Sequence, residues 1–127
     1  MTTKIKVTKY EAEKIVPPDI YEATIKSFSL GEGNFGDYVK IVFSISSGAY
    51  EGVEKSLLAS KKIQKSPKGP TKLMALAETV LGRVLEEDED FALDSLVGKN
   101  ARIVLGEPTT KDGIQYQKVE KVLASKL

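Results

Sequence analysis

The chain has 127 residues, 41% of them hydrophobic, a formal net charge of +1, and neither cysteine nor histidine. This length can bury a core without disulfides, and the missing residue types exclude thiol and imidazole chemistry, so we predict one domain with no catalytic residue, cofactor or metal. No apolar run reaches membrane-spanning length, and the chain is expected to be cytoplasmic, or a viral protein in its host cell.

Residues 1–18 are predicted to form an N-terminal arm or a short edge strand ahead of a domain at residues 19–127. The run Lys4-Ile5-Lys6-Val7 alternates weakly, and Pro17-Pro18 forces extended backbone and removes two ladder donors. The lysines of this arm are interpreted either as phosphate contacts or as solvated charges.

The stretch Ile20–Gly52 predicts two strands joined by a glycine-rich loop, Gly31–Gly36. Apolar residues alternate with period two on both sides of the loop, which places one face of each strand in the core. The predicted core residues are Tyr21, Ala23, Ile25, Val39, Ile41, Phe43 and Ile45. The opposite face of the second strand carries Tyr38 and Lys40, which burial does not require. We therefore expect this face to hold a ligand.

The loop itself matches the pattern G-x-G-x-x-G and contains Phe35. A dinucleotide site would need a helix after the loop, and a protein kinase would need a catalytic loop containing histidine, so neither interpretation fits. Glycines permit positive φ and close backbone approach, whereas a phenylalanine has no core use in so polar a loop. Phe35 is predicted to be either an exposed stacking platform or a buttress folded back on the body.

A third strand is predicted from about Tyr50 to Ser60, with a bulge at Gly52. The next segment, Lys61–Pro70, contains four lysines and is interrupted by two prolines and a glycine, so we interpret it as a basic loop rather than a strand or helix. The apolar period then changes to that of one amphipathic helix, Pro70–Leu81, with Gly82 as its C-terminal cap.

Acidic residues are concentrated after this helix. Six of the eighteen lie in the nine-residue segment 86–94, which has no Lys or Arg, so the remaining nineteen basic and twelve acidic residues carry +7. Such asymmetry indicates either a polyanion-binding surface beside a separate acidic patch or two faces that keep the protein soluble. Glu86–Asp90 is interpreted as a protein-docking segment or a solvated linker. Four apolar residues are expected to anchor it: Phe91, Leu93, Leu96 and Val97.

Two more strands are predicted, Ala101–Leu105 and Ile114–Leu123, joined by a hairpin loop with an Asp-Gly pair, Gly106–Gly113. In the first of them, alternate residues face the core: Ala101, Ile103 and Leu105. Three meandering strands, a helix and a hairpin are the element order of an all-β fold with one helix, the OB-fold. This is a five-stranded Greek-key barrel with its helix between strands three and four. The alternative is an open α+β sheet with one covering helix.

Several runs also carry a family resemblance: YEATIKSF, the glycine loop, GDYVKIVFSI, YEGVEKSLLAS, a helix ending in VLG, DSLVGKNARIVL and DGIQYQKVEKVL. Over residues 17–123 the chain resembles the small single-stranded DNA-binding and replication-associated OB proteins of bacteriophages and their archaeal counterparts. The resemblance implies nucleic-acid contact through the outer face of the second and third strands and the flanking loops. Transferred to this sequence, it implies roles for Tyr38, Lys40, Lys55, Phe35, Lys111 and Tyr116.

We therefore predict a non-enzymatic protein of replication, recombination or repair that binds single-stranded DNA, with RNA left open, through stacking rings and lysine–phosphate contacts. The predicted contacts are Phe35, Tyr38, Lys40, Lys55, Lys61, Lys62, Lys65, Lys111 and Tyr116. The alternative is an OB-fold protein–protein interaction module of a phage or replication complex, which the near-neutral total charge favours. An enzyme is disfavoured because the carboxylates of Glu86–Asp90 are contiguous and diverge. No membrane partner is expected, and homo-oligomerisation stays open.

Overall fold

The structure, a computed structural model, describes residues 3–5, 7, 14–34 and 36–126. Within them the fold is mostly β with one α-helix, as predicted: a five-stranded antiparallel sheet, two short hairpins, one helix and a 3₁₀ turn. In chain order the elements are β1 Asp19–Gly33, β2 Gly36–Ile45, β3 Glu54–Ser60, β4 Lys65–Ser66, β5 Gly69–Pro70, α1 Lys72–Leu81, η1 Leu93–Leu96, β6 Asn100–Leu105, β7 Thr109–Lys111, β8 Ile114–Tyr116 and β9 Val119–Ala124.

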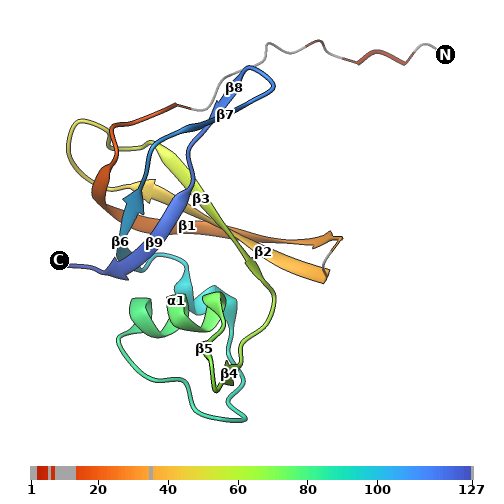
Figure 1. Cartoon of the computed structure of the whole chain (residues 1–127), viewed down its shortest axis with the longest axis vertical. Coiled ribbons are helices and arrows are strands. Elements are labelled where there is room, and N and C mark those ends of the chain that lie inside the picture. Colours follow the sequence, from red (N-terminus) through yellow and green to blue (C-terminus); the bar gives the residue numbers. More distant parts are fainter. Residues whose placement is uncertain (1–2, 6, 8–13, 35, 127) are drawn as a thin grey trace.

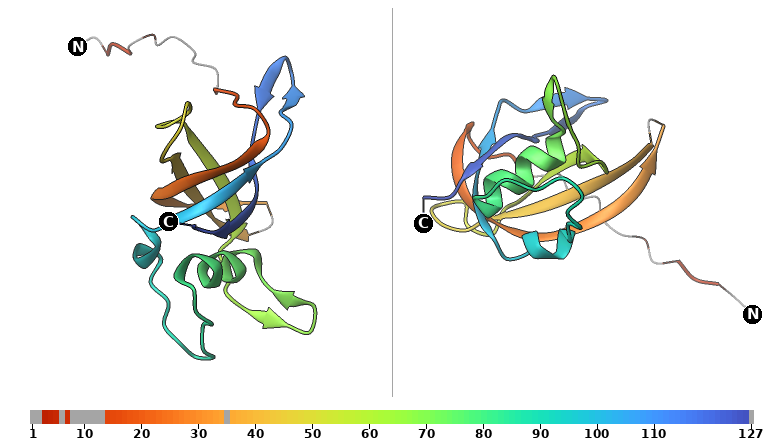
Figure 2. Two further views of the ribbon diagram at one scale, coloured as in Figure 1. Left: turned by 90° about the vertical axis from the view of Figure 1, so that its left-hand side faces the viewer. Right: turned by 90° about the horizontal axis from the view of Figure 1, so that it is seen from below.

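The main sheet has the strand order β3-β2-β1-β6-β9, and every neighbouring pair is antiparallel. The long strand β1 pairs with β6 along its first half and with β2 along most of its length, so Ala23 and Thr24 have partners on both sides. A register shift between Ile25 and Ser27 marks a β-bulge in β1, and bulges bend a strand and increase its twist. The sheet consequently curls around its core (Figures 1 and 2).

The predicted barrel is not closed within the described residues, because the edge strands β3 and β9 do not pair with each other. The two edges nevertheless come near one another, and α1 contacts both of them. In Figure 1 the helix lies below the curled sheet. α1 therefore covers one end of the gap between the two edge strands.

One apolar face and a glycine cap define α1. Its buried residues follow helical spacing: Leu73, Met74, Leu76 and Ala77. At the other end, Gly82 has a φ of 69°, and its N–H donates to the carbonyl oxygen of Glu78 at 2.9 Å. This left-handed conformation is the one that favours glycine after a helix. The predicted helix and its cap are confirmed, with the start at Lys72 instead of Pro70.

The core lies between the concave side of the sheet and α1. The predicted inward residues of β2 and β6 are confirmed, each 1% exposed or less: Val39, Ile41, Phe43, Ile45, Ala101, Ile103 and Leu105. In β1, Ala23 and Ile25 are equally buried. Tyr21 is half-buried and meets Tyr50 edge to face, with ring centroids 6.0 Å apart.

The core also includes Val16, which precedes the predicted domain boundary and is 1% exposed. The side chain of Gln117 holds it in place: Oε1 accepts from the Val16 N–H at 3.0 Å, and Nε2 donates to the Val16 carbonyl oxygen at 2.7 Å. Buried backbone groups require such partners. The folded body therefore begins before residue 19.

Several predicted boundaries differ from the structure. Most of the predicted Gly31–Gly36 loop is strand, because β1 continues to Gly33 and β2 starts at Gly36. Gly52 lies in a turn, with a φ of 89°, rather than in a bulge. The predicted loop Lys61–Pro70 contains the short β4–β5 hairpin.

The last part of the chain differs in two further ways. The predicted fifth strand is divided into β8 and β9, and the buried Gln117 lies at the break. Leu96 is buried and Phe91 and Leu93 pack against the core as predicted, but Val97 is 43% exposed and anchors nothing.

Candidate nucleic-acid interface

The outer face of β2 and β3 carries a mixed aromatic, aliphatic and basic surface. Tyr38 is paired with Ser60, and Lys40 with Leu58. Paired residues on adjacent strands point to the same side of a sheet, so these four side chains share one face. Leu58 is 56% exposed although it is apolar, Lys40 and Ser60 are exposed, and Tyr38 is half-buried. We call these four residues the outer patch.

The Tyr38 ring lies directly over Gly31, its cross-strand partner on β1. A Cβ atom at Gly31 would come within 2.4 Å of Tyr38 Cζ and 2.5 Å of Tyr38 Oη. Glycine is therefore required at this position to leave room for the ring, an arrangement in which an aromatic side chain covers bare strand backbone. The glycines of the hairpin thus position Tyr38 instead of forming a flexible loop.

A shallow hollow of about 280 Å³ adjoins the ring at the tip of the β1–β2 hairpin. Half of its lining residues are glycine, alanine or serine: the full set is Gly33, Asn34, Gly36, Asp37, Tyr38, Leu58, Ala59 and Ser60. Its volume is near the lower limit of small-ligand sites, about 300 Å³, so it suits one base-sized group. Phe35 lies outside the described residues, and the prediction of a stacking ring there stays a prediction.

Two of the predicted lysines lie beside the outer patch. The N–H of Lys61 donates to the carbonyl oxygen of Asp37 at 3.0 Å, and that of Lys62 to the carbonyl oxygen of Ser60 at 2.8 Å. These bonds fix the backbone of both lysines next to β2, and both side chains are exposed. Lys40 belongs to the outer patch itself, and Lys61 and Lys62 follow Ser60 directly in the chain.

The prediction that Lys55 contacts nucleic acid on the outer face is wrong, because Lys55 does not lie on that face. It is 1% exposed, and its Nζ donates to the carbonyl oxygen of Lys14 at 2.6 Å. Along β3, odd-numbered residues point inward and even-numbered residues outward, as strand geometry requires. Leu57 and Ala59 mark the inward set in the sequence. The same alternation assigns Leu58 to the outer face, which the sequence analysis missed.

The other predicted contacts lie elsewhere. Lys65, on β4, lines a second pocket together with acidic side chains. Lys111 and Tyr116 belong to the β7–β8 hairpin, which packs mainly on itself and projects at the end of the molecule opposite to β4 and β5 (Figure 1). Tyr116 is 48% exposed. The structure therefore groups Tyr38 with three of the predicted lysines and leaves these three residues apart.

The second pocket has a volume of about 630 Å³ and lies between the β4–β5 hairpin and the acidic segment. Its apolar lining consists of Ile63, Met74, Leu85 and Phe91. Its polar lining consists of Gln64, Lys65, Glu86, Glu87, Asp88 and Glu89. We call it the acid-rimmed pocket. Because Lys65 shares this pocket with carboxylates, it is a poor candidate for a phosphate contact.

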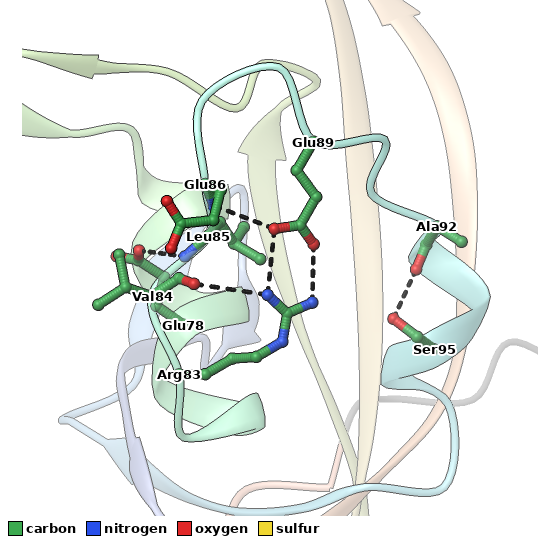
Figure 3. Close-up of polar contacts among 8 residues, drawn as sticks. All are labelled: Glu78, Arg83, Val84, Leu85, Glu86, Glu89, Ala92 and Ser95. Carbon is green, nitrogen blue, oxygen red and sulfur yellow. Dashed lines mark hydrogen bonds and ion pairs between the residues drawn. The ribbon is translucent and has the colours of Figure 1, made fainter.

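Figure 3 shows how the acidic segment is held. Arg83 donates two hydrogen bonds to Glu89, from Nη1 to Oε1 at 3.1 Å and from Nη2 to Oε2 at 2.7 Å. The Glu89 carboxylate also accepts from the Glu86 N–H at 3.0 Å, and the Glu78 carboxylate accepts from the Leu85 N–H at 2.8 Å. The hydrogen bond from Arg83, followed by that from Glu86, lowers the pKa of Glu89 to about 2. The segment is therefore a hydrogen-bonded loop, and the side chains of Glu86, Glu87, Asp88 and Asp90 are exposed.

Comparison with protein-family models finds no matching family, and comparison with curated proteins finds no match. Among the described residues, no group of three acidic side chains is placed to hold a metal ion. None of the helices in the described part of the chain is both long and apolar enough to cross a membrane.

Proposed function

We propose that the chain is an OB-fold protein that binds single-stranded DNA without catalysing a reaction. The strand order supports the fold: β1, β2 and β3 form a meander, β6 returns beside β1, β9 pairs with β6, and α1 lies between β3 and β6 in the sequence. A five-stranded Greek-key barrel would have this strand order, and OB-folds are partly open barrels. The unpaired edges of β3 and β9 agree with that form.

The outer patch is the observation that carries the function. Non-specific single-strand binders combine aromatic platforms for bases with a basic surface for the backbone. Here the Tyr38 ring shares one face of the sheet with the exposed Leu58 and Lys40, and the exposed Lys61 and Lys62 follow Ser60 directly in the chain. Because Gly31 and the neighbouring strand hold the ring in place, stacking costs little side-chain entropy. RNA offers the same chemistry, so we extend the proposal to single strands of either kind, with a role in replication, recombination or repair.

The test is a titration of fluorescently labelled oligo-dT of about 15 nucleotides, a length within the roughly 4 to 16 that one OB-fold covers. Fluorescence anisotropy gives the Kd, and a duplex of equal length is the control. We expect tighter binding to the single strand, because only unpaired bases can stack on the ring. The logarithm of the binding constant should fall with the logarithm of salt with a slope of about −2, since three phosphate contacts contribute about −0.7 each. Equal affinity for both forms, or a flat salt response, contradicts the proposal.

The second candidate function is a protein–protein interaction module, and the acid-rimmed pocket is the observation that favours it. If the protein is an interaction module and not a nucleic-acid binder, oligo-dT of any length should not bind measurably at physiological salt. A pull-down cannot decide between the two, because DNA can bridge proteins. The anisotropy titration with purified protein separates them.

A further inference from the structure

We infer that the acid-rimmed pocket binds the N-terminal arm of a second copy of the chain, so that the protein self-associates head to tail. The inference rests on complementary charge and shape between the arm and the pocket. It does not depend on nucleic-acid binding, and either proposal can fail without the other.

The pocket combines an apolar floor with a negative rim. Met74 and Leu85 are buried, and Ile63 is 38% exposed at the edge of the pocket. Above them stand the exposed carboxylates of Glu86, Glu87 and Asp88. Within the part of the chain that the structure describes, these three form no ion pair. Lys65 is the one basic residue among those that line the pocket.

The rim is also preorganised. The Arg83–Glu89 pair and the hydrogen bond from the Glu86 N–H fix the loop without using the carboxylates of Glu86, Glu87 and Asp88 (Figure 3). Arg83 offsets the charge of Glu89, so the three remaining carboxylates outweigh the single ammonium of Lys65. A ligand for this pocket should therefore be basic and should carry an aliphatic side chain for the floor.

The N-terminal arm has this chemistry. Its sequence alternates lysine with aliphatic residues, Lys4-Ile5-Lys6-Val7, and an extended chain places such residues on opposite sides. Ile5 is 88% exposed and Val7 94% exposed, so neither side chain is used by the fold of its own copy. A docked arm would place an aliphatic side chain on the floor and its lysines against the rim.

The position of the arm indicates that the pocket belongs to a second copy. The chain enters the body at Val16, where Gln117 holds it. Gln117 directly follows β8, and the β7–β8 hairpin lies at the end of the molecule opposite to α1, β4 and β5 (Figure 1). The eleven residue-to-residue steps from Ile5 to Val16 span at most about 40 Å. A compact chain of this length has a radius of gyration of about 14 Å and hence an outer radius of about 18 Å, so half its circumference is roughly 55 Å. An arm joined to a different surface on the next copy gives a ring or an open chain.

Sedimentation velocity of the full chain, without nucleic acid, tests the inference. We expect the average mass to rise with protein concentration and the association to weaken at high salt, because the rim is exposed. Ile5→Asp and the double variant Glu86→Lys/Glu87→Lys should each weaken association at least about tenfold. The matched control is Glu51→Lys/Glu107→Lys, which makes the same charge change at two exposed positions outside the pocket and should associate like the wild type.

A charge exchange completes the test. Lys4→Glu/Lys6→Glu should fail to associate alone, as should Glu86→Lys/Glu87→Lys, but a mixture of the two should associate because opposite charges meet again. Thermal unfolding of each variant should match the wild type, since the substituted pocket residues are exposed. A wild type that stays monomeric at every concentration overturns the inference, and the pocket would then bind another ligand. Association that neither the arm nor the rim variants reduce also overturns it, because the contact would then lie elsewhere.

Discussion

Substitution of Gly31 by alanine displaces the Tyr38 ring without removing it. The new Cβ would lie 2.4 Å from Tyr38 Cζ, closer than carbon atoms approach, so the ring must rotate away. Only the far end of a side chain has to move, and an off-rotamer tyrosine costs about 0.5–1.5 kcal/mol. Replacing a strand glycine by alanine returns about 0.5–1 kcal/mol. The free energy of unfolding should therefore change little.

Binding should respond much more strongly. A base stacked on an aromatic ring contributes about 1–3 kcal/mol, so loss of the platform should raise the Kd for oligo-dT roughly 5- to 150-fold. Anisotropy titration measures the Kd, and thermal unfolding followed by circular dichroism measures the stability of the same samples. Tyr38→Ala should weaken binding by a similar factor, and the double variant should be no worse than either single one, because both remove one interaction.

Gly33→Ala is the comparison that separates displacement of the ring from the mere addition of a methyl group, because Gly33 lines the same hollow but an added Cβ there leaves the Tyr38 ring in place. It makes the same substitution two residues along β1, but its Cβ would stand 3.6 Å from the nearest atoms, an ordinary contact. We expect its Kd to stay within about twofold of the wild-type value, less than 0.5 kcal/mol. A Gly31→Ala variant that binds as well as Gly33→Ala would refute the assignment of Tyr38 as a stacking platform.

Three further predictions concern charge, stability and pH. Lys61→Ala should weaken oligo-dT binding and reduce the salt slope by about 0.7, whereas Lys126→Ala should do neither in the same titration, because Lys126 follows β9 and its N–H donates to the Glu22 carboxylate, away from the outer patch. Gln117→Leu should lower the free energy of unfolding by about 2–4 kcal/mol in urea denaturation, because it leaves two buried backbone groups unpaired. The lowered pKa of Glu89, about 2, means that the stabilisation from Arg83 is present above the unfolded pKa and is lost as the pH falls toward 2. The difference in melting temperature between wild type and Glu89→Gln should therefore shrink between about pH 4.5 and 2, and a constant difference over that range would contradict it.

The elements that sequence predicted well depend on local signals. The alternation of apolar residues predicted the inward face of β2. The helical spacing of apolar residues, with a glycine after them, predicted α1 and its cap at Gly82. The Asp112-Gly113 pair predicted the turn between β7 and β8, where both residues have a positive φ, 53° and 78°. Each signal lies within a few residues of the structure it determines, so no knowledge of distant contacts was needed.

The features that sequence could not predict depend on partners far along the chain. Gln117 breaks the predicted fifth strand because its amide bonds to Val16, 101 residues away. The Lys55 ammonium group donates to the carbonyl oxygen of Lys14, 41 residues earlier, and no sequence pattern around Lys55 predicts that hydrogen bond. Its inward direction was nevertheless readable from Leu57 and Ala59, and the family resemblance led to the wrong face.

In the candidate site, too, the features that depend on local signals were predicted, and those that depend on distant contacts were not. Tyr38 and Lys40 were placed correctly on the outer face by alternation alone. The role of Gly31 depends on the register of β1 against β2, which a glycine-rich sequence does not fix. The separation of Lys65 from the outer patch depends on where the β4–β5 hairpin folds, beside the acidic segment. Lysines that are close in sequence therefore face different surfaces.

The central claim, that single strands bind on the outer face of β2 and β3, is tested most directly by backbone amide chemical shifts. Isotope-labelled protein is titrated with oligo-dT, and the residues whose shifts change are mapped on the structure. We expect the largest changes at Tyr38, Lys40, Leu58, Ser60 and Lys61, with little change around Glu86–Glu89. Changes confined to the acid-rimmed pocket, or no changes at concentrations that saturate the anisotropy signal, would contradict the claim.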